Sequence, residues 1–305
     1  RGGGRGGGMG AVGVVALLLG GCGEARGDAD GGAGGDGKAG EREQAREALD
    51  RYEEAVRAGG GGARFVPVGE ITGQVGEWEG AGAGDRKRSL AAGRVVAGND
   101  LPAAPEATGE VTWAGGDTVT LPLISATQAV DEMAMAGHPE DCPECEPLEA
   151  IAARLVTVPV ETTRGRAEVP AWEYRLKGTA VRITRPAIAR SASVKITPPS
   201  WDPYNAPGGL AIDSAATSTG SRGMTVSFTG SPGPGSEPCG ADYTAEGVES
   251  AHAVVVIVET HPHAPGETCT DIGAHRTATV ELKEPLGERA VLEVQQGLPV
   301  PVTIS

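Results

Sequence analysis

The strongest constraint on the fold is a pair of alternating segments joined by a short polar turn. Residues 156–160 place valine at every second position, and after Val169 the segment 172–176 alternates apolar with charged side chains. The Thr-Arg-Gly-Arg sequence at 163–166 forms the turn between them. Because successive side chains of a strand point to opposite faces, this period of two predicts two antiparallel strands with one buried face. Val181 and Ile183 continue the pattern, so we expect a three-stranded meander.

The C-terminal part of the chain carries further strand signals at short and regular spacing. These segments are residues 224–228, 254–258, 277–283, 290–295 and 299–304. Residues 198–209 are rich in proline and glycine, and they mark a boundary before these strands. Such spacing is typical of a β-sandwich. We therefore expect a mainly β protein with two antiparallel β-sandwich-like units.

One amphipathic helix is predicted ahead of the β units, over residues 41–58. Its apolar face would consist of Ala45, Ala48, Leu49, Tyr52, Ala55 and Val56. The helix could act as a stalk or bind a partner, or its apolar stripe could pack back on the body, which is the more common arrangement. Before it, the glycine- and aspartate-rich residues 22–40 lack the apolar surface needed to fold, and they predict a flexible linker. The expected order is a signal segment 1–21, the linker 22–40, the helix 41–58, a β-rich domain 63–200 and a β-sandwich-like domain 208–305.

The N-terminal segment has the features of a secretory signal. Arg1 and Arg5 precede an uncharged apolar stretch, residues 11–19, which is too short to span a bilayer. The stretch ends in Leu19-Gly20-Gly21-Cys22, which resembles the lipobox of bacterial lipoproteins. That resemblance implies that Cys22 becomes the first residue of the mature chain and carries a lipid anchor in the cytoplasmic membrane, on its extracytoplasmic face. The alternative is an ordinary secretory signal in which Cys22 carries no lipid.

Net charge limits the range of partners. The chain has 41 acidic and 26 basic residues, a net charge of −15, and no basic stripe. This balance argues against nucleic acid as a partner. Aromatic residues make up only 3% of the chain, so the cores must be built from smaller apolar side chains that bury less area. Covalent cross-links would help to stabilise such cores.

With Cys22 assigned to the lipid, four cysteines remain: Cys142, Cys145, Cys239 and Cys269. An even number outside the cytoplasm indicates two disulfides, with three possible pairings. Proximity in the sequence favours Cys142–Cys145 and Cys239–Cys269. The long bridge would close about 31 residues and stabilise the fold by roughly 3.5 kcal/mol, whereas the short one would contribute about 2 kcal/mol.

Cys142-Pro143-Glu144-Cys145 also has the spacing of thiol–disulfide oxidoreductases. That chemistry requires a cysteine at a helix N-terminus within a βαβ unit. Residues 148–155 could be helical, but no parallel βαβ pattern surrounds them. A structural clip in a loop is therefore favoured, and redox activity is the alternative.

Metal and hydrolase chemistry receive little support from the sequence. His138 lies near the first cysteine pair, and His261, His263 and His275 form a second group in a loop rich in proline and glycine. Zinc sites need paired ligands from two well-placed elements, so these histidines are interpreted as solvated loop residues. The sequence contains no serine-hydrolase or zinc-protease motif. We therefore expect no catalytic residue, no metal site and no cofactor.

The four tryptophans, Trp78, Trp113, Trp172 and Trp201, are prominent among so few aromatic residues. They could form a stacking platform for a sugar or a peptide, or they could pack in the cores. Core packing is favoured, and Trp172 fits it best because Tyr174 and Leu176 share its face.

Three segments resemble a group of predicted lipoproteins from actinobacteria. They are Gly73-Gln74-Val75-Gly76-Glu77-Trp78-Glu79, the region from the Cys142–Cys145 pair through Thr162-Thr163-Arg164-Gly165-Arg166 to Trp172-Glu173, and Pro285-Leu286-Gly287-Glu288-Arg289. The resemblance would cover most of the chain after the signal segment. It implies a location in the cell envelope and assigns no chemistry.

These features predict a non-enzymatic lipoprotein on the outer face of the cytoplasmic membrane. Its expected role is binding or structural, with an envelope protein or a glycan as partner. The alternative is an extracytoplasmic thiol–disulfide redox protein that uses Cys142 and Cys145.

Overall fold

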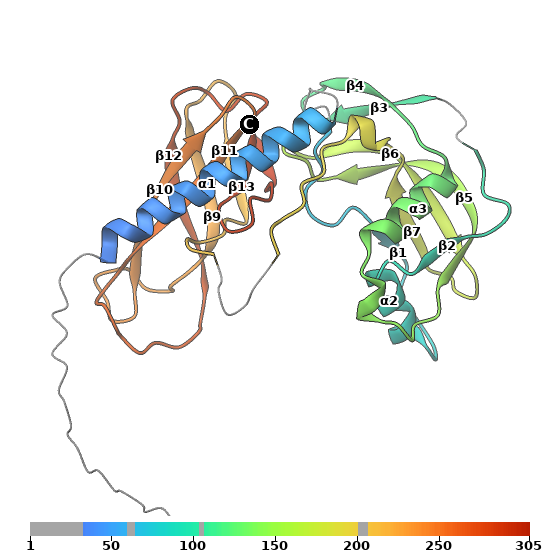
Figure 1. The fold of residues 1–305 in the computed structure, drawn as a ribbon, viewed down its shortest axis with the longest axis horizontal. Helices are drawn as coiled ribbons and strands as arrows, with labels where there is room; N and C mark the ends of the chain where they lie inside the picture. Colours follow the sequence, from blue (N-terminus) through green and yellow to red (C-terminus); the bar gives the residue numbers. More distant parts are fainter. Residues whose placement is uncertain (1–32, 60–64, 104–106, 201–206) are drawn as a thin grey trace, which may run out of the picture.

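The computed structural model describes residues 33–59, 65–103, 107–200 and 207–305, so Cys22 and Trp201 lie outside it. Figure 1 shows two β units side by side, with one long helix lying along the C-terminal unit. The mainly β architecture expected from the sequence is confirmed. Among the residues described, no helix is long and apolar enough to cross a membrane.

The first unit is built on one seven-stranded sheet. Its strands are β1 (Gly73–Val75), β2 (Val95–Ala97), β3 (Thr108–Trp113), β4 (Thr118–Pro122), β5 (Leu148–Val160), β6 (Ala167–Leu176) and β7 (Arg182–Pro186). β6 is the central strand, because it pairs along its length with β5 on one edge and shares its other edge between β3 and β7. β1 extends the sheet beyond β7, β4 extends it beyond β3, and β2 pairs with β5. The unit is thus a single branched sheet rather than a sandwich of two sheets.

The meander predicted from the alternating segments is present. Val156 of β5 pairs with Ala171 of β6, and Tyr174 of β6 pairs with Ile183 of β7, both antiparallel. Residues 148–155, which could have been helical, instead form the first half of β5 because they pair along the edge of β6.

Two helices pack on this sheet, α2 (Ala83–Ala91) and α3 (Ala126–Ala136). Ser125 caps α3: its hydroxyl accepts a hydrogen bond from the Gln128 backbone N–H, and the Gln128 side chain returns a bond to the backbone of Ser125. The loops that follow α2 and α3 meet at Gly93 and Gly137, where a Cβ on either glycine would clash with the backbone of the other. The close approach of the two loops therefore requires glycine.

Trp172 and Tyr174 join α3 to the sheet. Both side chains are buried against α3. The indole N–H of Trp172 donates to the Ile124 carbonyl at 2.9 Å, and the Tyr174 hydroxyl donates to the Ala126 carbonyl at 2.7 Å. Each large side chain therefore has its polar atom satisfied within the core, as burial requires.

The C-terminal unit is a two-layer sandwich. Its strands are β8 (Ser214–Thr217), β9 (Gly223–Gly230), β10 (Ala241–Glu249), β11 (Ala253–Pro262), β12 (Ala274–Glu281), β13 (Ala290–Glu293) and β14 (Val302–Ile304). One sheet has the order β10-β11-β13 and the other β12-β9-β8-β14. The pairs β11–β13 and β8–β14 are parallel, so the sheets are mixed rather than purely antiparallel as expected.

β11 is buried on both faces. Val254, Val256 and Val258 point into the core between the two sheets. Val255 and Ile257 point the other way, against the helix α1 (Ala33–Ala58). The continuous apolar run of this strand follows from that position, because a strand covered on both faces has no wet side.

α1 supplies the outer cover of the C-terminal sandwich. Ala45, Ala48, Leu49, Tyr52 and Val56, all of them predicted to lie on its apolar face, are buried. Nearer the start of the helix, the Arg42 guanidinium forms two hydrogen bonds with the Glu246 carboxylate of β10, both at 2.7 Å. The apolar stripe thus packs back on the body, which was the favoured alternative.

The helix is longer than the sequence pattern indicates. Residues 33–40, which were predicted to belong to the flexible linker 22–40, form the first turns of α1. Extending an existing helix costs much less than starting one, so the stable segment after residue 40 can extend toward the N-terminus despite the glycines.

Candidate ligand-binding cleft

A cleft of about 800 Å³ lies where the two units meet. Six segments line it: the end of α1, residues 65–71, the second half of α3, the stretch from Arg185 to Ile196, Asp213 before β8, and residues 298–301 before β14. Its volume falls in the range of small-molecule sites, which are often found between domains.

The walls of the cleft are mostly apolar. They include Phe65, Ile71, Ile188, Val194, Leu298 and Val300, which come from both units. Val194 also packs with Val66 and the end of α1 in the core that continues into the C-terminal unit. The cleft is therefore bordered by packed side chains, which favours a largely formed site over an open gap.

Three positively and three negatively charged residues line the cleft: Arg185, Arg190, Lys195, Glu70, Glu132 and Asp213. Arg190 Nε lies 3.5 Å from the Glu132 carboxylate, so these two are paired. The Glu70 carboxylate accepts a hydrogen bond of 2.7 Å from the Thr72 backbone N–H.

Arg185 is the least solvated of these cations. It lies near the end of β7, where Thr72 precedes the neighbouring strand β1, and its Nη1 donates to the Thr72 hydroxyl at 2.9 Å. Burial lowers the pKa of the Arg185 guanidinium, although the negative charges of Glu70 and Glu132 act in the opposite direction. The group is still a cation at neutral pH, because an arginine pKa starts so high.

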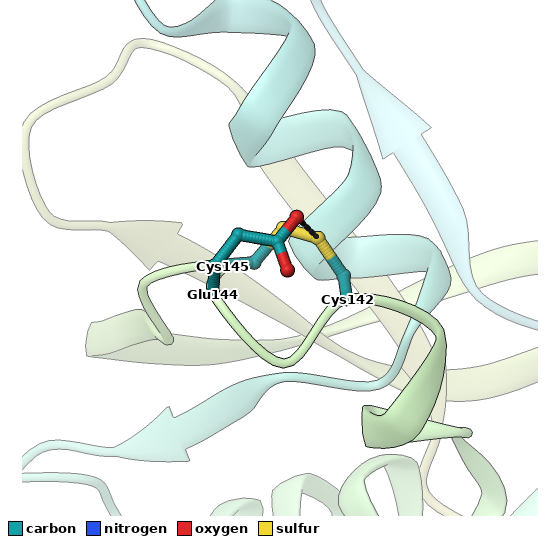
Figure 2. Close-up of side chains that lie close together, drawn as sticks. All are labelled: Cys142, Glu144 and Cys145. Atoms are coloured by element: carbon teal, nitrogen blue, oxygen red, sulfur yellow. Dashed lines mark hydrogen bonds between the residues drawn. A yellow bond between two sulfur atoms is a disulfide. The ribbon is translucent and has the colours of Figure 1, made fainter.

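The Cys142–Cys145 pair is bonded, and neither cysteine lines the cleft. Figure 2 shows the disulfide together with Glu144. Both cysteines are buried and pack with Ala92 at the end of α2. The Glu144 carboxylate lies 3.6 Å from the Cys142 sulfur and 3.5 Å from Arg88 Nη1. The disulfide thus holds its loop against α2.

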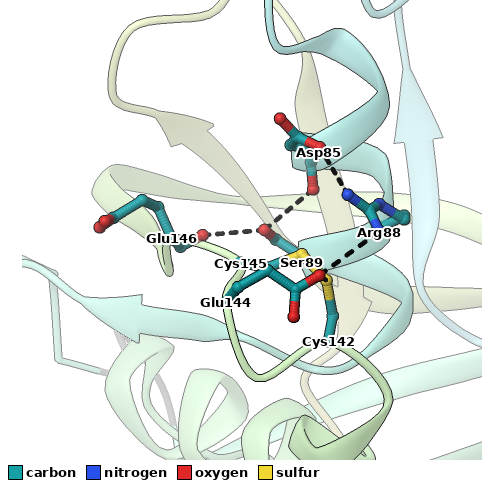
Figure 3. Close-up of a disulfide and its surroundings, with 7 residues drawn as sticks. All are labelled: Asp85, Arg88, Ser89, Cys142, Glu144, Cys145 and Glu146. Atoms are coloured by element: carbon teal, nitrogen blue, oxygen red, sulfur yellow. Dashed lines mark hydrogen bonds and ion pairs between the residues drawn. A yellow bond between two sulfur atoms is a disulfide. The ribbon is translucent and has the colours of Figure 1, made fainter.

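Figure 3 shows how the surrounding side chains strengthen this contact. The buried Ser89 hydroxyl lies 3.0 Å from the Asp85 carbonyl oxygen and 2.8 Å from the Glu146 carbonyl oxygen, and it can donate to either one. It thereby ties α2 to the chain just before β5. Arg88 also pairs with Asp85 at 2.7 Å.

The setting of this disulfide differs from that of reactive pairs. Cys142 follows a short 3-10 helix, Pro139–Asp141, and the chain after Cys145 enters β5. Among the described elements, neither cysteine lies in the first turn of an α-helix, the position that stabilises a thiolate in redox pairs of this spacing. The geometry is that of a clip between α2 and β5.

The second disulfide joins Cys239 and Cys269 in the C-terminal unit. Cys239 lies in the β9–β10 loop with φ at 60°, and Cys269 lies in the β11–β12 loop. The Cys239 backbone N–H donates to the Glu267 carboxylate at 2.9 Å, which also fixes the two loops to one another. Both bonded pairs are those that sequence proximity favours.

The structure does not bring the candidate histidines together. His138 contacts Glu140, His261 contacts the Thr244 hydroxyl at 2.8 Å, and His263 contacts the Gly235 carbonyl at 3.1 Å. In the described ranges, the groups with metal-ligating geometry are Cys142, Glu144 and Cys145, and Cys239, Glu267 and Cys269. In both groups the two thiols are used in a disulfide, and neither contains a histidine.

The three described tryptophans do not form a shared platform. Trp113 and Trp172 are buried in different cores of the first unit, and the Trp113 indole donates to the Thr162 hydroxyl at 3.0 Å. Arg164 stacks over the Trp113 ring at 4.4 Å. Trp78 is half-buried, and its indole N–H donates a hydrogen bond to the side-chain oxygen of Gln74.

Comparisons of the chain with protein-family models, with curated proteins and with solved structures give no match.

The cleft was not among the features predicted from the sequence. Its lining comes from six separated segments with no shared spacing, so no local pattern marks Arg185 or its neighbours as a group.

Proposed function

We propose that the protein is a lipid-anchored extracytoplasmic binding protein whose ligand occupies the cleft between the two units. The observation that carries this proposal is the cleft itself, with about 800 Å³ enclosed by apolar walls and a few charged groups. Two disulfides are compatible with an oxidising compartment outside the cytoplasm. The lipobox at Cys22 supports anchoring to the cytoplasmic membrane.

Binding fits the cleft better than catalysis does. The acidic groups Glu70 and Glu132 are engaged by Thr72 and Arg190, and no nucleophile is paired with a base among the described residues that line the cleft. The proposed role is to hold a ligand at the membrane surface, either for itself or for presentation to an envelope partner.

A neutral apolar fluorophore, N-phenyl-1-naphthylamine, tests the cleft. Its fluorescence should rise on binding to the wild-type protein. Ala136→Trp should abolish most of that rise, because Ala136 is exposed and lines the cleft, so the indole would fill it without disturbing a core. Ala134→Trp is the matched control, since Ala134 is exposed on the same helix outside the cleft. Equal signals from the two variants, or no signal from the wild type, would refute the cleft as a binding site.

Membrane fractionation tests the anchor. Cys22→Ala should move the protein from the membrane to the soluble extracytoplasmic fraction, and the wild-type protein should carry the mass of its acyl chains. Binding of the fluorophore by the released variant should be unchanged, because Cys22 precedes every described residue. A variant that stays on the membrane, together with a wild type without acyl mass, would contradict the lipid anchor.

A further inference from the structure

Arg185 is a cation without an ion pair in the least solvated part of the cleft. Its guanidinium donates to the neutral Thr72 hydroxyl, and among the described residues it forms no ion pair with a carboxylate. The two carboxylates that influence it, Glu70 and Glu132, are bonded elsewhere. A partly buried cation usually has an anionic partner, because losing hydration without one is costly.

The remaining donors of this guanidinium are free to bind a ligand. Arginine has five N–H donors in a planar fork, and one nitrogen, Nη1, is committed to Thr72. The bond to Thr72 restrains the group near the end of β7. A fixed fork is suited to a carboxylate, which accepts two parallel hydrogen bonds.

We propose that Arg185 binds the carboxylate of a ligand whose remaining body is apolar, so that the cleft selects monocarboxylic acids such as acyl chains. This inference rests on the proposed function and adds the class of ligand. The apolar body would lie along Phe65, Ile71 and Ile188, and the carboxylate would supply the charge that Arg185 lacks.

The carboxylates in the cleft favour a ligand that carries a single negative charge. Glu70, Glu132 and Asp213 line the same space. Arg190 is paired with Glu132 and Lys195 is exposed, so Arg185 is the half-buried cation left for a ligand. A phosphate dianion would be repelled by the three carboxylates more strongly than a monocarboxylate would. Ligands with a cationic end are disfavoured by Arg185 itself.

Displacement of N-phenyl-1-naphthylamine by three ligands of equal chain length provides the test. Dodecanoate should displace the fluorophore at concentrations at least about tenfold lower than dodecanamide or dodecanol, since only the carboxylate gains charge-assisted hydrogen bonds. Arg185→Gln should remove this preference, because it removes both the charge and the fork of donors. Arg185→Lys should retain part of it, because the charge remains but the fork is lost.

Lys195→Gln is the matched control, since Lys195 also lines the cleft but is exposed. It removes the same charge and should keep the preference for dodecanoate. Thermal melting of each variant checks that it is folded, and the comparison of ligands in the wild-type protein stands without any variant.

The outcomes separate the two proposals. Equal displacement by the three ligands, or a preference that survives in Arg185→Gln, would overturn the role of Arg185. The cleft would still be supported as the binding site if Ala136→Trp blocks fluorophore binding. A wild-type protein that does not bind the fluorophore would overturn both the cleft as a binding site and the role of Arg185.

Discussion

Nδ1 of His252 lies 2.7 Å from the Glu53 carboxylate, although 199 residues separate them in the chain. The Ser250 hydroxyl donates to the other oxygen of Glu53 at 2.9 Å. Glu53 belongs to α1, and the other two residues form the turn between β10 and β11. The helix is therefore joined to the C-terminal sandwich by polar contacts at this turn as well as by its apolar face.

Replacing Tyr52 with alanine should destabilise the C-terminal unit. Tyr52 is 1% exposed in the core between α1 and β11. Loss of a buried aromatic side chain costs about 3 kcal/mol, and hydrogen exchange of β11 and β13 should accelerate accordingly. Glu47→Ala changes an exposed position on the same helix and serves as the control. Identical exchange in the two variants would mean that the helix does not support the sandwich in solution.

The contribution of Glu53 to stability should depend on pH. Burial would raise the pKa of Glu53, but hydrogen bonds from Ser250 and His252 outweigh it and hold the pKa below its ordinary value of 4.5. A carboxylate with a lowered folded-state pKa stabilises the fold above its unfolded-state pKa, and this stability is lost as the pH falls through the folded-state value. Wild type should therefore exceed Glu53→Gln by about 1 kcal/mol at pH 6, with the gap closing below about pH 4.5. Urea denaturation at several pH values measures the gap, and a constant difference down to pH 3 would contradict the assignment.

Removing the Cys239–Cys269 bond should weaken only the C-terminal unit. The double substitution Cys239→Ser and Cys269→Ser should cost roughly 2–4 kcal/mol, because the bond closes a long loop of the unfolded chain. The described tryptophans all lie in the first unit, so tryptophan fluorescence should report an unchanged transition there. Circular dichroism should detect the earlier loss of strand structure. A fluorescence transition that shifts as far as the strand signal would show that the two units unfold together.

Trp172→Phe should separate the hydrogen bond of this residue from its packing. The bond from the indole N–H to the Ile124 carbonyl is buried. Phenylalanine keeps most of the apolar contact with α3 but leaves that carbonyl without its donor, which costs about 1–3 kcal/mol, together with the loss of some volume. Trp78→Phe, at a half-buried position on the same unit, should cost less. Thermal melting of both variants ranks the two sites.

The sequence predicts the local pairings well and the long-range packing poorly. The β5–β6 hairpin follows from alternation because both strands and their turn lie within a short segment, and the period of two sets their faces. β10 was missed, since most of its positions are only half-buried and its side chains show no apolar alternation. The helix stripe at Tyr52 was recognisable, but nothing local indicates that its partner is β11.

The cleft shows the same limit. Arg185 alternates correctly as a residue of β7, so its pattern marks a strand and no site. What distinguishes it is its bond to Thr72 and its place in a cleft that Phe65 and Val300 also line, all from distant segments of the chain. Proximity in the sequence was sufficient to predict the two disulfide pairings. Cys142 and Cys145 lie in one loop, and the loops that carry Cys239 and Cys269 are adjacent in the fold.

The position of α1 on the C-terminal sandwich has a consequence for biosynthesis. The ribosome makes this helix before the first unit, and it makes β11 and β13 after that unit. Until β11 and β13 have been made, the apolar stripe around Tyr52 has no sheet to pack on, so α1 can take its place on the sandwich only after the first unit has been synthesised. The first unit, in contrast, is contiguous and can fold while the rest is still being made. A nascent chain of this protein therefore passes through a stage in which the first unit is complete while the apolar face of α1 is still exposed.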